Sequence, residues 1–173
     1  MKAQRFDRKW PVILLLGVIL ADQLTKLWIV KSIPLNTVGW QMWGGFFRII
    51  HVRNLGIAFS MGNGLPDFFR SLLFIILPLA VLLLLFVFYL RERSMSTLQG
   101  WAVAGIIGGG LGNIIDRIFR PAGVVDFLDV KFYGLFGLER FPTFNVADAS
   151  VVVCGILLIL SHILEGRATR SSR

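Results

Sequence analysis

The sequence is poor in the residues that form disulfides and bind metals, with 1 cysteine and 2 histidines among 173 residues. A single thiol excludes an internal disulfide and any thiolate metal cluster built by one chain. Cys154 lies in the apolar run VVVCGILLIL, which is typical of a buried small hydrophobe rather than of a nucleophile. Neither His51 nor His162 has a second ligand at helical i+4 spacing, so the sequence predicts no metal site and no cofactor.

Acidic residues are also scarce, because 10 Asp and Glu stand against 18 Lys and Arg, giving a net charge of +8. Proteins that bind nucleic acids combine such an excess with a basic stripe and exposed aromatic side chains. No such stripe is present here, since the basic residues lie at the tails and between apolar runs. This distribution argues against a nucleic-acid partner and predicts contacts with membrane lipid headgroups.

Apolar residues, by contrast, make up 55% of the chain, which is too much for an ordinary soluble domain of this size. Four apolar runs are long enough to cross a bilayer as helices. We therefore expect an all-α membrane protein that forms one domain over residues 1–173. Its four transmembrane helices are expected at about 10–31, 68–90, 97–116 and 143–164.

The first apolar run follows a basic start and could be mistaken for a secretory signal peptide. Its second half carries Asp22, Gln23, Thr25 and Lys26 in place of a small-residue cleavage site, which favours a retained helix. Asp22 and Lys26 are four residues apart, so they share a helical face and can form an ion pair. The spacing alone leaves two roles open for this pair, anchoring of the helix end or a function within the membrane.

Glycine and proline break residues 32–67 into short pieces, among which FFRIIHVRN has the composition of a strand. We expect a small strand-containing element on the membrane surface, and its glycines and tryptophans suggest a lid over a site. Residues 117–142 form a second loop on the same side, and residues 165–173 form a tail. The distribution of basic residues places both termini in the cytoplasm, so that both loops are extracytoplasmic.

The strongest functional signal lies in residues 108–150, which contain GGGLGNIIDR, VVDFLDV and FNVADAS. Ionisable groups near membrane depth are costly and therefore tend to mark a function. Asp126 and Asp148 are candidates for a catalytic pair of carboxylates, although chemistry alone does not separate Asp126 from Asp129. The glycines favour close packing of helices, because the run is flanked by apolar residues and lacks the lysine of a P-loop.

Two neighbouring carboxylates cannot both ionise cheaply, so they share one proton and can act together as base and acid. Asn54, Asn113 and Asn145 could orient a substrate through hydrogen bonds without adding charge. Arg117 could contact a substrate carbonyl or a headgroup, or could simply pair with Asp116 or with a loop.

Two other classes of function fit part of the pattern. Intramembrane Asp, Asn and Lys also occur in small ion-coupled or proton-coupled transporters, but no inverted repeat of broken helices is present. A membrane scaffold could use the glycine-rich helix for assembly, yet it would not need paired acids.

Five motifs, in this order, resemble those of the lipoprotein signal peptidases (signal peptidase II), a family of bacterial membrane aspartyl proteases. Each motif alone is weak evidence, but together they cover nearly the whole chain. They are DQLTK (22–26), NLGIAFS (54–60), GGGLGNIIDR (108–117), VVDF (124–127) and FNVADAS (144–150).

This resemblance implies cleavage of prolipoproteins just before a diacylglyceryl-modified cysteine, in the bacterial inner membrane near its outer face. It also implies inhibition by globomycin. The family's catalytic pair falls on Asp126 and Asp148, which leaves Asp129 without a catalytic role. The residues expected to bind substrate or inhibitor are Asp22, Lys26, Asn54, Gly56, Asn113, Arg117 and Asn145.

Overall fold

The computed structural model describes residues 9–56, 66–92 and 94–171. Within those residues, four helical segments are long and apolar enough to cross a membrane, with lengths between 20 and 24 residues. The expectation of four apolar helices is therefore confirmed. The first and third are α1 (Lys9–Ser32) and α4 (Thr97–Phe119). The second, Phe68–Arg91, lies in the continuous run of α2 (Asp67–Ser71), η3 (Leu72–Ile76) and α3 (Leu77–Arg91), and the fourth, Val146–Glu165, lies in α5 (Val146–Ser171).

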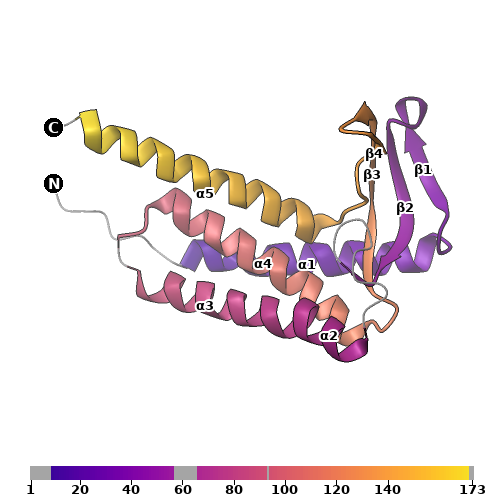
Figure 1. Ribbon diagram of the computed structural model, residues 1–173, viewed down its shortest axis with the longest axis horizontal. Helices are drawn as coiled ribbons and strands as arrows, with labels where there is room; N and C mark the ends of the chain where they lie inside the picture. The colour runs from indigo at the N-terminus through magenta and orange to yellow at the C-terminus, as the bar shows by residue number, and fades with distance from the viewer. Residues whose placement is uncertain (1–8, 57–65, 93, 172–173) are drawn as a thin grey trace.

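The helices lie side by side along the long axis of the molecule (Figure 1). α4 is the central helix, because it packs against α1, α3 and α5. Most large apolar side chains on α1, α3 and α5 are exposed, whereas α4 buries about half of its length. An exposed apolar surface of this extent suits helices that face lipid.

The glycine-rich stretch of α4 allows the close contacts that this central position requires. A Cβ atom at Gly108 would lie 2.8 Å from the backbone oxygen of Leu15 on α1. A Cβ at Gly109 would collide with the backbone oxygen of Ala147 on α5. Small residues at these positions let neighbouring helix backbones approach each other, as the sequence predicts.

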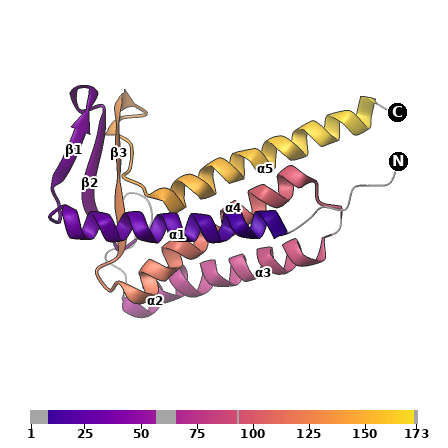
Figure 2. The same ribbon diagram turned by 180° about the vertical axis from the view of Figure 1, so that it is seen from behind.

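A four-stranded antiparallel sheet, in the order β1-β2-β3-β4, covers one end of the helices. Both ribbon views place it at the end opposite the start of α1 and the last turns of α5 (Figures 1 and 2). The strands are β1 (Val38–Met42), β2 (Phe47–Asn54), β3 (Val124–Leu135) and β4 (Leu138–Arg140). A short 3-10 turn, η1 (Trp43–Gly45), joins β1 to β2.

The sheet is larger than the sequence predicts, since the segment expected to be a loop supplies β3 and β4. The fold is thus mostly helical with a sheet, and not an all-α protein with one small strand element. β2 pairs with β3, so that Val52 lies opposite Asp126 and Asn54 lies opposite Val124. Ile29 and Ile33, at the end of α1, pack against Val125 and Phe127 of β3 and anchor the sheet to the helices.

Candidate active site

Asp126 lies on β3 and Asp148 lies on the first turn of α5, and both line one cavity of about 520 Å³. Asn54, Asn113 and Arg117 line the same cavity from β2 and α4. Its remaining walls are largely apolar and come from β3, from the chain just before α5 and from α5 itself. They include Val124, Phe141, Pro142, Phe144, Val152 and Val153. The cavity therefore has a polar end with two carboxylates and an apolar body.

Two asparagine side chains connect the carboxylates. Asn113 donates from Nδ2 to Oδ1 of Asp148 at 2.7 Å. Asn145 donates from Nδ2 to Oδ1 of Asp126 at 2.7 Å and to Oδ1 of Asn113 at 3.0 Å. Asp126 and Asp148 are thus joined through a continuous path of amide hydrogen bonds, which fixes their relative position.

Asn145 and Asp148 also cap α5 reciprocally. The backbone N–H of Asp148 donates to Oδ1 of Asn145 at 2.9 Å, and the backbone N–H of Asn145 donates to Oδ2 of Asp148 at 3.1 Å. This is the arrangement of a capping box, in which side chains satisfy the first free amides of a helix. Asp148 is thereby fixed on the first turn of α5, at the end of the helix that faces the sheet.

Asp126 is more deeply buried than Asp148, with only 3% of the residue exposed. Burial raises the pKa of Asp126 to about 7, and the neighbouring charge of Asp148 adds to this rise. Hydrogen bonds from Asn54 and Asn145 and the charge of Lys26 oppose it. The two carboxylates therefore occupy different environments, and the proton is held more easily by Asp126 than an exposed aspartate would hold it.

Gly56 links two of the polar residues that line the cavity. Its backbone N–H donates to Oδ1 of Asn54 at 3.0 Å, and its backbone oxygen accepts from Nη2 of Arg117 at 2.8 Å. Asn54 in turn donates to Oδ2 of Asp126 at 3.2 Å. Of the partners considered for Arg117, the structure thus provides a loop carbonyl. Residues 57–65, which include the end of this motif and part of the lid predicted over residues 32–67, lie outside the described residues.

Asp129, which chemistry alone could not separate from Asp126, is occupied elsewhere. Residues three apart on a strand point to opposite faces, so Asp129 does not share the face of Asp126, as it would on a helix. Asp129 is buried, and its carboxylate binds Arg48 at 2.6 Å and Arg140 at 2.7 Å. Arg140 also donates to the backbone oxygen of Gly45, so this cluster holds the tips of the sheet together.

Asp22 and Lys26 form the ion pair expected from their spacing, at 2.8 Å between Nζ and Oδ2. Both residues are fully buried, and neither lines the cavity that contains the dyad. Lys26 instead donates to Oδ1 of Asn113 at 2.8 Å. Their predicted contact with substrate stays a prediction, while the structure places them directly behind an asparagine that contacts Asp148.

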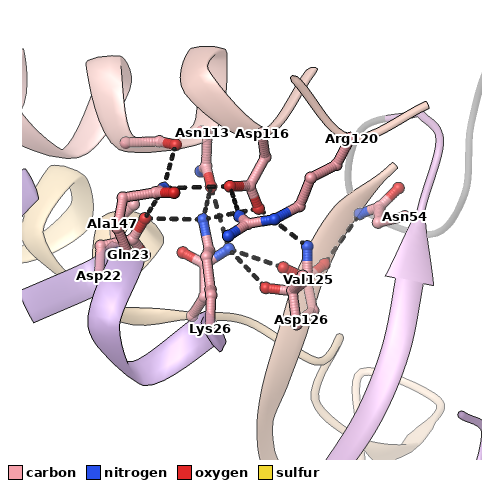
Figure 3. Close-up of polar contacts among 12 residues, drawn as sticks. Asp22, Gln23, Lys26, Asn54, Asn113, Asp116, Arg120, Val125, Asp126 and Ala147 are labelled. Carbon is pink, nitrogen blue, oxygen red and sulfur yellow. Dashed lines mark hydrogen bonds and ion pairs between the residues drawn. The ribbon is translucent and has the colours of Figure 1, made fainter. Parts of the chain in front are cut away.

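Sequence reasoning missed three residues of this buried cluster, namely Gln23, Asp116 and Arg120 (Figure 3). Asp116 is fully buried and binds Lys26 at 3.2 Å, Gln23 at 3.0 Å and Arg120. The local signals for it were its helical spacing from Asn113, three residues before it, and from Arg120, four residues after it. Within the described part of the chain, no three His, Cys, Asp or Glu side chains could hold a metal ion.

The chain is similar to known proteins over almost its whole length. Residues 14–164 match the family described as Signal peptidase (SPase) II. The chain is 46% identical over 173 residues to the lipoprotein signal peptidase of Treponema pallidum strain Nichols, covering 99% of this chain and 93% of that protein. It is 45% identical over 150 residues to the lipoprotein signal peptidase of Borreliella burgdorferi strain ZS7, covering 87% of this chain and 86% of that protein.

The fold is similar to that of a bacterial membrane enzyme solved by the in meso method at 2.3 Å resolution. The TM-score is 0.81 at 26% sequence identity, and the match covers 96% of this chain and 94% of the solved one.

Proposed function

This chain belongs to the signal peptidase II family, and we propose that it removes signal peptides from prolipoproteins by cleaving before the diacylglyceryl-modified cysteine. The enzymes of this family are aspartic endopeptidases of the bacterial membrane. The observation that carries the proposal is the cavity in which Asp126 and Asp148 stand at the polar end and apolar walls form the body. A peptide bond could lie at the carboxylates while acyl chains lie against Phe144, Val152 and Val153.

The surroundings of the two aspartates suggest which of them acts as the base and which as the acid. Asp148 accepts hydrogen bonds from the backbone N–H of Asn145 and from the side-chain amide of Asn113. Asp126 is the better holder of the shared proton, because burial disfavours its charge. We therefore assign Asp148 as the base and Asp126 as the acid of the resting pair.

In the proposed reaction, Asp148 removes a proton from water as the water oxygen attacks the scissile carbonyl carbon. Asp126 donates a hydrogen bond to the carbonyl oxygen and stabilises the charge that develops there. The proton taken by Asp148 then passes to the amine of the lipid-modified cysteine as the carbon–nitrogen bond breaks. The products are a signal peptide with a new carboxylate and a lipoprotein with a free amino-terminal cysteine.

The polar residues around the dyad are proposed to orient the substrate. Asn54 and Arg117 line the cavity, and both side chains form a hydrogen bond with the backbone of Gly56. They can therefore present an amide and a guanidinium group to substrate carbonyls. A cyclic peptide inhibitor such as globomycin would occupy the same cavity and compete with substrate.

The position of the site supports the proposed topology. β3, which carries Asp126, and the beginning of α5, which carries Asp148, lie at the sheet end of the molecule, opposite the start of α1 and the last turns of α5 (Figure 2). With both ends of the chain in the cytoplasm, as the positive-inside rule predicts, the site lies near the outer face, where prolipoproteins emerge. The alternative of an ion-coupled transporter is not favoured, since the family is one of peptidases.

The proposal is tested with purified protein and two forms of one prolipoprotein, with and without the diacylglyceryl group. We expect cleavage of the lipid-modified form only, and mass spectrometry should find the new amino terminus at the modified cysteine. Equal cleavage of the two forms, or a cut at another bond, would contradict the proposed specificity.

A further inference from the structure

A buried carboxylate holds the backbone immediately before each catalytic aspartate. The backbone N–H of Val125, which precedes Asp126, donates to Oδ2 of Asp116 at 3.1 Å. The backbone N–H of Ala147, which precedes Asp148, donates to Oδ1 of Asp22 at 3.0 Å. Two aspartates outside the cavity therefore fix the two chain segments that carry the dyad.

One ammonium group joins these two carboxylates. The Nζ atom of Lys26 lies 2.8 Å from Oδ2 of Asp22 and 3.2 Å from Oδ2 of Asp116. The side chains of Lys26, Asp22 and Asp116 are all 0% exposed. Figure 3 shows Lys26 between the residues that hold β3 and those that hold α5. The two backbone segments that carry the dyad are thus connected through one buried cation, and the amide of Gln23 bridges the same two carboxylates.

The same ammonium group also orients an amide that touches the dyad. Lys26 donates to Oδ1 of Asn113 at 2.8 Å, which leaves Nδ2 of Asn113 to donate to Asp148 at 2.7 Å. A flipped amide would bring its NH₂ group against the ammonium and its oxygen against the carboxylate. The charge of Lys26 therefore selects the one amide orientation in which Asn113 donates to Asp148.

The cluster is balanced in charge and saturated in hydrogen bonds. Arg120 pairs with Asp116, so two cations accompany two carboxylates. Gln23 donates from Nε2 to Asp22 at 3.1 Å and to Asp116 at 3.0 Å. Buried ion clusters add little net stability compared with apolar packing, and they can instead specify one arrangement of the groups that they hold.

We propose that Lys26 is a positioning residue for the peptidase reaction, which clamps both catalytic segments through Asp22 and Asp116 and orients Asn113 toward Asp148. This inference rests on the proposed function, because it assumes that Asp126 and Asp148 carry out the reaction. It assigns Lys26 and Asp22 a role behind the dyad, in place of a direct contact with substrate.

The charge of Lys26 also acts on the proton affinity of the pair. Asp126 faces Asp148 from α5, Arg117 from α4 and Lys26 from α1, while β2 presents the uncharged amide of Asn54. Lys26 favours the ionised form of Asp126. Removal of Lys26 should therefore increase the proton affinity of Asp126, the proposed acid, and shift the pH–rate profile to higher pH. Loss of a merely structural contact would leave the profile unchanged.

The test uses the full chain with the double substitution Lys26→Met and Asp22→Asn, which removes one charge of each sign and leaves Asp116 paired with Arg120. We expect kcat to fall by about 10- to 100-fold, since small misplacements of reacting groups have effects of this size. KM should stay within about twofold of wild type, because neither residue touches the cavity. The matched control is Asp129→Asn, which also disrupts a buried ion cluster but should keep the wild-type kcat and pH profile.

Each outcome decides the question. A lower kcat with unchanged KM and a profile moved to higher pH supports the clamp. A raised KM with unchanged kcat would mean that Lys26 contacts substrate, and wild-type kinetics in the folded variant would mean a structural role only; both overturn the proposal. If the double variant does not fold, Asp22→Asn alone is compared by hydrogen exchange at the Ala147 amide and by kcat, and a faster exchange without loss of kcat overturns it.

The proposed function is monitored in the same assay. Failure of the wild type to cleave lipid-modified prolipoprotein, or full activity of Asp126→Asn, would count against the peptidase assignment itself. The clamp is judged only from preparations in which the wild type cleaves and Asp126→Asn does not.

Discussion

Asn145 offers a prediction that separates stability from catalysis, because its side chain has two distinct tasks. Its Oδ1 accepts the backbone N–H of Asp148 at 2.9 Å and caps α5. Its Nδ2 bridges Asp126 at 2.7 Å and Asn113 at 3.0 Å. We compare two substitutions, Asn145→Ala, which removes both tasks, and Asn145→Ser, which keeps a capping oxygen but is too short to bridge the carboxylates.

The magnitudes follow from these contacts. Loss of a helix cap costs about 1 kcal/mol, and a buried acceptor left without its donor costs about 1–3 kcal/mol. Asn145→Ala should therefore lower the free energy of unfolding by about 2–4 kcal/mol, and Asn145→Ser by about 1 kcal/mol less than that. Both should lower kcat by about 100-fold, because the bridge that fixes Asp126 relative to Asp148 is lost in each.

The assay combines thermal unfolding in detergent or lipid with cleavage of a lipid-modified peptide at a temperature where both variants are folded. If Asn145→Ser retained the kcat of the wild type, the amide bridge would have no part in positioning the dyad. Equal stability of the two variants would show that the cap contributes nothing measurable.

Three further predictions concern the surroundings of the dyad. Because burial raises the pKa of Asp126 to about 7 from 3.8, the folded state binds its proton more tightly than the unfolded state does, and Asp126 lowers stability as pH rises through that window. Asp126→Asn should therefore raise the thermal midpoint at pH 8 relative to wild type and change it little at pH 4, and an equal shift at both pH values would contradict the raised pKa. Asp129→Asn should retain cleavage but lose about 1–3 kcal/mol of stability, since it leaves two arginines without their buried partner; loss of activity at full folding would return Asp129 to the list of catalytic candidates. Gly109→Leu should destabilise the protein by about 1–3 kcal/mol or more and reduce cleavage, because the new side chain meets the backbone of Ala147 next to Asp148, and a variant with wild-type melting and activity would refute the close contact.

The four apolar helices could be predicted from the sequence, because a run long enough to cross a bilayer is a local signal. β3 could not be predicted, since the buried half VVDF does not alternate between apolar and polar residues. Its pairing with β2 joins Val52 to Asp126, although two membrane-length helices lie between them in the chain, and no short window of sequence contains that contact.

The two aspartates of the proposed dyad could be named from motifs, but the hydrogen-bonded path that joins them through Asn113 and Asn145 could not be predicted. The candidate pair of Asp126 and Asp148 came from the resemblance, whereas chemistry alone did not separate Asp126 from Asp129. The sequence could not predict that Asp129 would pair with Arg48 and Arg140 in the sheet. The buried cluster around Lys26 forms only where α1, α4 and α5 meet. In the sequence, Asp116 and Arg120 therefore look like an ordinary surface ion pair at helical spacing. Only the fold shows that the polar residues of the first helix lie behind the dyad.

The most direct test of the central claim is cleavage of a diacylglyceryl-modified prolipoprotein by wild type, Asp126→Asn and Asp148→Asn, with folding of each variant verified by thermal unfolding. The proposed dyad predicts cleavage by the wild type and no detectable cleavage by either folded variant. Cleavage at the wild-type rate by either variant would contradict it.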